Sequence, residues 1–318
     1  MMVFAALLGS VQAQEGKKPF RLGLIGLDTS HVTAFTGYIN ERSEEHGCVV
    51  VAGYPGGSPD IPSSANRVDK FTQELREKHG LEIMDSVEAL LEKVDGVLLE
   101  SVDGRPHLEQ AKPVIAAGKP LFIDKPMAGS LKDVLTLFRL AKDANVPCWS
   151  SSSLRYSPGI IGMRNDDELG EVMGCEAFSP CHLEEHHPDL YWYGVHGVEI
   201  LFTIMGTGCK HVQRTHCEGV DLAVGVWEGG RIGTFRGLRS GKQDYGALVY
   251  GSKSIKRSGP YAGYGPLCDE IVRFFQTGKV PVPPEETIEL FAFMTAADLS
   301  KEREGVSISL EEVLKEAQ

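Results

Sequence analysis

Short apolar runs alternate with helical stretches along the first 150 residues, and this alternation constrains the fold more than any other feature. The predicted strands cover residues 21–26, 49–52, 96–99, 121–123 and 147–151, and the predicted helices cover 32–39, 68–79, 87–91, 107–117 and 131–144. A repeat of strand and helix places successive strands parallel in one sheet, with helices on its faces. The sequence therefore predicts an α/β protein whose first domain, residues 17–150, is a doubly wound parallel sheet.

Residues 151–318 have a different pattern. Strand-like segments at 174–178, 222–226, 231–235 and 247–250 are separated by glycine turns, and helices are predicted at 195–205, 268–277 and 287–301. This pattern is typical of a largely antiparallel sheet with one polar face, so we expect an α+β second domain with an open sheet. A chain of 318 residues with 42% hydrophobic residues is long enough for two such domains.

The charge and the hydropathy exclude several classes of partner. Lys and Arg total 32 against 44 for Asp and Glu, which gives a formal net charge of -12. This charge repels nucleic acid and anionic lipid surfaces at long range, so we expect no nucleic-acid partner. Beyond the first residues, no apolar run reaches the roughly 18 residues that a membrane-spanning helix needs.

The first 16 residues are predicted to be a signal or leader segment. An apolar run at 3–8 is followed by small residues, and Val11-Gln12-Ala13 resembles the small-x-small site of a signal peptidase. The expectation is an exported, periplasmic protein, with a cytoplasmic protein as the alternative, because no basic residue precedes the apolar run. The seven cysteines form no C-x-x-C pair, which favours buried thiols over a zinc ribbon or a disulfide framework.

Three stretches resemble the glucose-fructose oxidoreductase, inositol dehydrogenase and MocA (Gfo/Idh/MocA) family. Residues 106–126, which end in Asp124-Lys125-Pro126, are similar to the family's segment leading into its Glu-Lys-Pro motif. Residues 193–199 are similar to the pattern in which a catalytic histidine opens a helix, and residues 155–158 resemble the start of the family's second domain. The resemblance implies a Rossmann-type first domain, NAD or NADP as cofactor, and a homo-oligomer formed through the second domain's sheet.

The phosphate-binding loop departs from the family's pattern. The family has G-x-G-x-x-G after the first strand, whereas this chain keeps Gly26 and has Asp28 and His31 at the second and third glycine positions. A carboxylate about 4 Å from a pyrophosphate costs about 4 kcal/mol at an effective dielectric near 20. Asp28 has a second interpretation, as the N-cap of the following helix, with its oxygen on the free amides of Ser30 or His31.

The end of the second strand also lacks the usual ribose ligand. The family has an acidic residue there, but this chain continues Ala52-Gly53-Tyr54-Pro55. Tyr54 is either a stacking partner for adenine or a cover for the end of the sheet. The cofactor-binding residues expected from the resemblance are Gly26, Asp28, Thr29, Ser30, His31, Tyr54, His107, Asp124 and Lys125.

The resemblance places Lys125 and His196 at the reacting carbon. Histidine titrates near neutral pH and can take a hydroxyl proton, while a lysine ammonium can stabilise the developing alkoxide. Glu199 lies one helical turn after His196, a spacing that allows it to orient the imidazole. The predicted catalytic residues are therefore Lys125, His196 and Glu199.

The segment 182–193 mixes aromatic, acidic and histidine side chains, as a carbohydrate site does. The predicted substrate-binding residues are Arg155, Tyr156, His182, His187, Tyr191 and Tyr193. The histidines and acids of this segment could also ligate a metal, but their spacing fits no metal motif, and we predict no metal here.

Three functions remain open from the sequence. The first is an NAD(P)-dependent oxidoreductase acting on a sugar or polyol. The second is a carbohydrate-binding or regulatory protein that has lost the usual dinucleotide binding, which Asp28, His31 and the missing ribose acid favour. The third is redox-assisted glycoside cleavage, which would use the same residues.

Overall fold

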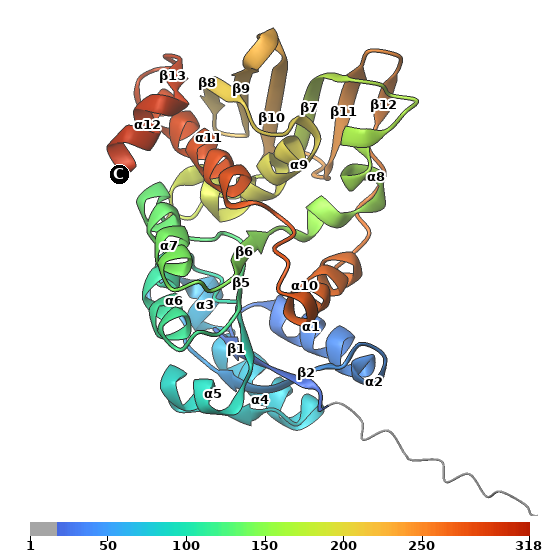
Figure 1. Cartoon of the computed structure of the whole chain (residues 1–318). Helices are drawn as coiled ribbons and strands as arrows, with labels where there is room; N and C mark the ends of the chain where they lie inside the picture. Colours follow the sequence, from blue (N-terminus) through green and yellow to red (C-terminus); the bar gives the residue numbers. More distant parts are fainter. Residues whose placement is uncertain (1–17) are drawn as a thin grey trace, which may run out of the picture.

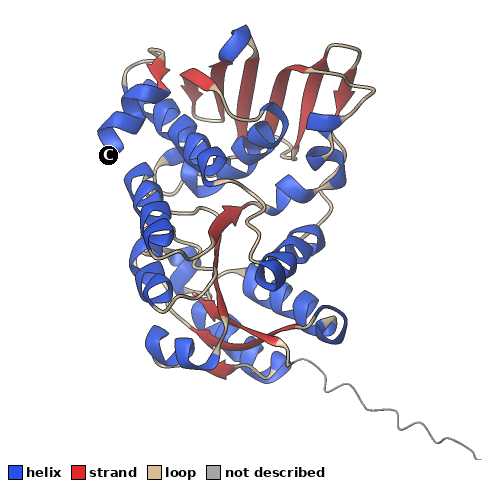
Figure 2. Cartoon of the chain, in the orientation of Figure 1, coloured by secondary structure: helices blue, strands red, loops and turns tan. Residues whose placement is uncertain are grey.

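The computed structural model describes residues 18–318, so the predicted leader at 1–16 lies outside the described residues. One sheet lies in each half of the chain, and helices separate the two sheets (Figures 1 and 2). Within the described residues, no helix has the length and apolar character needed to cross a bilayer. All seven cysteines are free thiols, and Cys217 alone among them is exposed.

The first sheet has six parallel strands in the order β3-β2-β1-β4-β5-β6, which is the Rossmann order and confirms the predicted doubly wound sheet. The strands are β1 (Phe20–Ile25), β2 (Cys48–Tyr54), β3 (Glu82–Ile83), β4 (Gly96–Leu99), β5 (Leu121–Asp124) and β6 (Cys148–Ser151). The strands β4, β5 and β6 are buried along their whole length, because helices cover both faces.

The helices of the first half are α1 (Ser30–Glu41), α2 (Ser43–His46), α3 (Pro62–Ala65), α4 (Val68–His79), α5 (Val87–Lys93), α6 (His107–Ala116) and α7 (Leu131–Asp143). Apolar residues of α5, α6 and α7 pack on one face of the sheet, together with Val97 and Leu99. Residues of α1 and α4 pack on the other face with Leu98, as the alternation of side chains along a strand requires.

A helix from the second half completes the first domain. Helix α10 (Gly265–Thr277) packs on the face that carries α1, and its Phe274 ring contacts Trp149 of β6 at a centroid distance of 5.8 Å. Its buried positions, Leu267, Cys268, Ile271 and Phe275, belong to the same core cluster as α1. The first sheet is therefore covered in part by a helix that follows most of the second sheet's strands in the sequence.

The second sheet has seven strands in the order β12-β11-β7-β10-β9-β8-β13, and β7 with β10 is the parallel pair in an otherwise antiparallel arrangement. This confirms the predicted largely antiparallel sheet. The strands are β7 (Val172–Pro180), β8 (Cys209–Cys217), β9 (Val220–Trp227), β10 (Ile232–Leu238), β11 (Gly246–Gly251), β12 (Ile255–Arg257) and β13 (Ile308–Ser309).

One face of this sheet is covered and the other is open. Helices α9 (Val195–Met205) and α11 (Pro284–Glu302) pack on the covered face, and α8 (Pro158–Ile161) and α12 (Leu310–Ala317) lie at its ends (Figure 1). A π-helical turn over Leu190–Gly194 leads directly into α9, and such turns are frequent at functional sites. The covered face of the second sheet thus presents the start of α9 to the first domain.

Candidate active site

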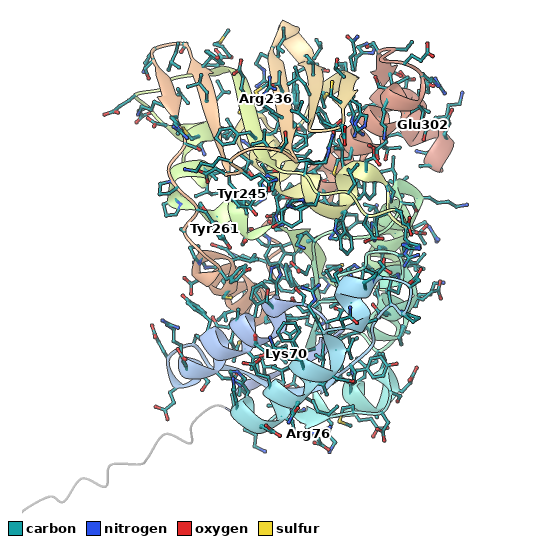
Figure 3. All side chains as sticks on the ribbon, turned by 180° about the vertical axis from the view of Figure 1, so that it is seen from behind. Lys70, Arg76, Arg236, Tyr245, Tyr261 and Glu302 are labelled. Atoms are coloured by element: carbon teal, nitrogen blue, oxygen red, sulfur yellow. The ribbon has the colours of Figure 1, made fainter. Side chains whose placement is uncertain are left out.

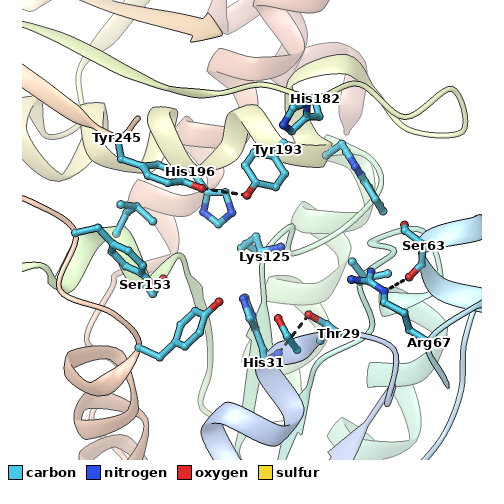
Figure 4. Close-up of a pocket in the computed structure, with 16 residues that line it drawn as sticks. Thr29, His31, Ser63, Arg67, Lys125, Ser153, His182, Tyr193, His196 and Tyr245 are labelled. Atoms are coloured by element: carbon cyan, nitrogen blue, oxygen red, sulfur yellow. Dashed lines mark hydrogen bonds between the residues drawn. The ribbon is translucent and has the colours of Figure 1, made fainter. Parts of the chain in front are cut away.

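A pocket with a volume of about 340 Å³ lies between the two domains, at the carboxyl ends of the first sheet's strands. Ligands bind at this edge in open α/β sheets. Figure 4 shows Lys125 in the middle of the pocket, between His31 from the first domain and His196 from α9. The lining residues are Thr29, Ser30, His31, Ser63, Arg67, Val102, Lys125, Ser153, Leu154, His182, Trp192, Tyr193, His196, Tyr245, Tyr261 and Tyr264.

The start of α1 faces this pocket without an acidic side chain in its first turn. Thr29 is the N-cap, and its hydroxyl accepts a long hydrogen bond of 3.4 Å from the His31 amide. The interpretation of Asp28 as the helix cap is therefore wrong. The Asp28 carboxylate is fully buried and turned away from the pocket, where it accepts hydrogen bonds from the Val102 amide at 2.9 Å and the Ser64 hydroxyl at 2.5 Å.

The residues at this edge fit a dinucleotide. Gly26 has a φ of +86°, and a Cβ at this position would overlap Ser101, so the tight turn after β1 requires glycine. The amides and hydroxyls of Thr29 and Ser30 at the start of α1 would hold the pyrophosphate. Arg67, at the start of α4, also lines the pocket and would offer a positive charge to a phosphate group of the cofactor.

His196 is held as a neutral base. Its Nδ1 lies 2.7 Å from the Ser152 hydroxyl oxygen. Burial lowers the pKa of His196 well below its usual range, and the nearby positive charge of Lys125 lowers it further. The imidazole is therefore uncharged at neutral pH and can accept a proton on the nitrogen that does not contact Ser152.

Residues 21–152 match the GFO_IDH_MocA model, described as an oxidoreductase family with an NAD-binding Rossmann fold. The first domain belongs to this family. A comparison with curated proteins gave no match.

Solved structures, among them two named as dehydrogenases, share the two-domain fold. A "probable dehydrogenase" from Thermotoga maritima superposes with a TM-score of 0.77 at 18% identity, covering 92% of this chain and 100% of the other. The myo-inositol 2-dehydrogenase from Lactobacillus plantarum gives 0.75 at 14% identity, with coverage of 92% and 99%. GenD2 from gentamicin A biosynthesis, solved in complex with NAD, gives 0.74 at 13% identity, with coverage of 95% and 99%.

In this Gfo/Idh/MocA-type fold, Glu199 does not orient the histidine as expected. Its Oε1 accepts hydrogen bonds from the Arg155 Nε at 2.5 Å and from the Ser151 hydroxyl at 2.9 Å. Ser152, which directly follows β6, contacts His196 instead. The expected role of Glu199 at the imidazole is therefore wrong.

Arg155 is also not available to a substrate. Its guanidinium is buried and forms ion pairs with Glu199 and with Glu286 of α11, the latter at 2.6 Å. Burial would lower the pKa of Arg155, but the two carboxylates outweigh this effect and raise it. The prediction of Arg155 as a substrate ligand is therefore corrected to a structural role between β6, α9 and α11.

Several other predicted residues lie outside the pocket lining. Tyr54 packs on the core, and the buried His107 lies between the carbonyl oxygens of Ser101 and Met127. Tyr156 is buried beside Trp149, and the Tyr191 hydroxyl lies 2.7 Å from that of Thr295. His187 Nε2 lies 2.8 Å from the Asp103 carboxylate. None of these side chains lines the pocket.

The structure adds residues that the sequence did not indicate. Tyr245, Tyr261 and Tyr264 come from loops after residue 238, and Figure 3 shows Tyr245 and Tyr261 at the level between the sheet that carries Arg236 and the helix that carries Lys70. The hydroxyls of Tyr245 and Tyr193 lie 3.0 Å apart, and the Tyr261 hydroxyl lies 2.9 Å from that of Ser153. No motif marks them, because the contacts join segments far apart in the sequence.

Proposed function

We propose that this chain is an NAD(P)-dependent oxidoreductase that acts on a hydroxyl group of a sugar or polyol. The observation that carries the proposal is the meeting of three elements in one pocket: the open start of α1, Lys125 after β5, and the neutral imidazole of His196. When bound, the nicotinamide supplies the hydride acceptor. The remaining chemistry belongs to side chains of this chain.

In the proposed reaction, His196 takes the proton of the substrate hydroxyl while hydride leaves the carbon. The tautomer that serves this step has the proton on Nδ1, donated to the Ser152 oxygen, so that Nε2 carries the free lone pair. The Lys125 ammonium stabilises the negative charge that develops on the substrate oxygen. His196 is neutral before the step, so the imidazole can accept the proton without first losing one.

The upper wall of the pocket supports a carbohydrate-like substrate. Tyr193, Tyr245 and Tyr261 offer aromatic faces to the C–H surface of a sugar ring, and their hydroxyls offer hydrogen bonds. Ser153 and His182 add further hydroxyl and imidazole groups. The fold's likeness to inositol dehydrogenases is in keeping with a polyol.

The test combines cofactor release with two pocket variants. We expect NAD or NADP in the supernatant of the denatured protein, or a rise in Tm with millimolar nucleotide. Lys125→Ala and His196→Ala should each reduce kcat by about 100-fold or more, because each removes a group that acts on the transferred proton or its charge. Lys132→Ala and His211→Ala change the same residue types at exposed positions and should leave kcat unaltered.

Two results would contradict the proposal: no nucleotide effect on Tm together with no retained cofactor, or near-normal rates in both pocket variants. A rise in Tm with polyols but none with nucleotides would favour the carbohydrate-binding or regulatory function. The buried carboxylates of Asp28, Glu100 and Asp124 next to α1 favour that second candidate. Turnover of glycosides instead of free sugars would indicate redox-assisted cleavage.

We also propose that the protein is exported and that it forms a homo-oligomer through the open face of the second sheet. Exposed apolar side chains on the sheet's strands support the second proposal: Met173 at 49%, Ile232 at 53%, Val226 at 39% and Ile255 at 63% exposure. Light scattering of the purified protein tests the assembly, and fractionation of expressing cells tests the export. A monomer at micromolar concentration would contradict the oligomer.

A further inference from the structure

Three metal-ligating side chains converge at the base of the pocket. His31 lies in the first turn of α1, Glu100 directly follows β4, and Asp124 ends β5. The strands β1, β4 and β5 are neighbours, so their carboxyl ends bring these residues together. One donor atom from each side chain lies within 4.8 Å of the other two.

The oxygens of this cluster lack the partners that buried polar atoms normally have. Glu100 is fully buried, and neither of its carboxylate oxygens has a hydrogen-bond partner among the described residues. The Oδ1 of Asp124, which is 2% exposed, also has none. A buried carboxylate without a partner costs several kcal/mol in general, so a ligand at this position would remove a real penalty.

The charges at this edge indicate a cation. Asp28, Glu100 and Asp124 bring three carboxylates into a buried region, and Lys125 brings one ammonium. Three carboxylates and one ammonium leave two negative charges in excess, which a divalent cation would balance.

We propose that His31, Glu100 and Asp124 bind a divalent first-row transition metal ion at the base of the interdomain pocket. One imidazole and two carboxylates suit Mn²⁺, Fe²⁺ or Zn²⁺ better than Ca²⁺, which prefers oxygen ligands alone. Two donors that each lie about 2.1 Å from one ion are about 3 to 4 Å apart. The distances between the donor atoms of this cluster run from 2.6 Å to at most 4.8 Å, on either side of this range. The shortest of them, between His31 Nδ1 and Asp124 Oδ2, would have to lengthen slightly.

The surroundings hold the imidazole in place and leave one side of the site accessible. The His31 ring stacks on Phe35 at a centroid distance of 5.2 Å and meets the edge of Tyr264 at 4.8 Å. His31 lines the pocket, whereas Glu100 and Asp124 lie beneath it. Three protein ligands leave coordination positions that face the pocket, where a hydroxyl or carboxylate oxygen of a bound molecule could coordinate. The site does not depend on a bound dinucleotide, so it goes beyond the proposed function.

The test uses the full chain, treated with a chelator and dialysed, with Mn²⁺ or Zn²⁺ alone as the probe and no nucleotide present. Titration followed by the EPR signal of free Mn²⁺ should show one site per chain, and either ion should raise Tm. Glu100→Gln keeps the shape of the side chain but removes an anionic ligand, so it should weaken binding by about 100-fold or more. His216→Ala is the matched control, because His216 contacts Asp221 at 2.7 Å in the second sheet, away from the cluster. It should bind the ions as the wild type does.

A second readout needs only the wild type and keeps the test decisive if Glu100→Gln does not fold. The electron spin echo of Mn²⁺ bound to the wild type should show coupling to an imidazole nitrogen, which His31 would supply. Absence of binding at 1 mM ion would contradict the proposal and leave a buried proton on Glu100 as the explanation of the cluster. Binding without nitrogen coupling, or with unchanged affinity in Glu100→Gln, would contradict it as well.

Discussion

Two buried clusters of charged side chains lie close to the pocket, and they differ in how their charges are satisfied. In the first, Arg155 is held between Glu199 and Glu286, and Arg164 adds a second cation beside Glu286. In the second, Glu100 and Asp124 keep oxygens that have no hydrogen-bond partner among residues 18–318, next to His31. A cluster whose charges are all paired stabilises the fold. The oxygens without partners in the second cluster are the basis of the metal site proposed above.

The largest expected effect on the free energy of unfolding is that of Arg155→Ala in the first cluster. Arg155→Ala leaves the carboxylates of Glu199 and Glu286 buried without Arg155, and breaking such a pair costs about 3 to 5 kcal/mol in other proteins. Urea unfolding should show a loss of this size in the free energy of unfolding. An effect below 1 kcal/mol would mean that the cluster is more hydrated than its burial indicates.

His196 belongs to neither cluster, and it should make the free energy of unfolding depend on pH. Its folded-state pKa lies below the unfolded value near 6.5, so the unfolded chain binds the proton more tightly. Stability should be fully present above about pH 6.5 and should fall as the pH decreases below it. His196→Gln cannot take up this proton and should lose less stability between pH 7 and pH 5 than the wild type. Parallel curves for the two proteins would contradict the lowered pKa.

A smaller effect is expected at Ser152, which contacts the imidazole where Glu199 was expected to do so. Ser152→Ala removes the contact with His196 and the hydrogen bond that the Ser152 hydroxyl accepts from the Leu154 amide, and should cost about 1 to 2 kcal/mol of stability. It should also lower kcat more than it raises KM, because the imidazole loses its orientation while the pocket lining is retained. Ser151→Ala removes the neighbouring hydroxyl that contacts Glu199 and serves as the control. Equal effects on kcat in both variants would contradict a specific role of Ser152.

The smallest expected change in the free energy of unfolding is that of Glu100→Gln, which contrasts most directly with Arg155→Ala. Glu100→Gln loses no hydrogen bond to the described residues, so in chelator-treated protein it should alter the free energy of unfolding by less than about 1 kcal/mol. The same urea titration as for Arg155→Ala measures it. A loss as large as that of Arg155→Ala would show that the second cluster is also structural.

Parts of the site could be read from the sequence because they sit on short local patterns. Lys125 follows a buried strand and precedes a proline, and His196 begins a helix after a glycine, so both positions in the pocket were predictable. The direction of a side chain was less predictable. Asp28 and Glu199 were assigned by their spacing along the chain, but their carboxylates contact Ser64 and Arg155, which lie 36 and 44 residues away.

The sequence by itself determined the two sheets, five of the six strands of the first and four of the seven strands of the second, and the elements that carry Lys125 and His196. These features follow from hydrophobic periodicity, which acts over one element at a time. The tertiary structure alone decided that α10 covers the first sheet, that three tyrosines close the pocket, and that His31, Glu100 and Asp124 meet beneath it. Such contacts depend on how elements pack against one another, and no local pattern of residues records that packing.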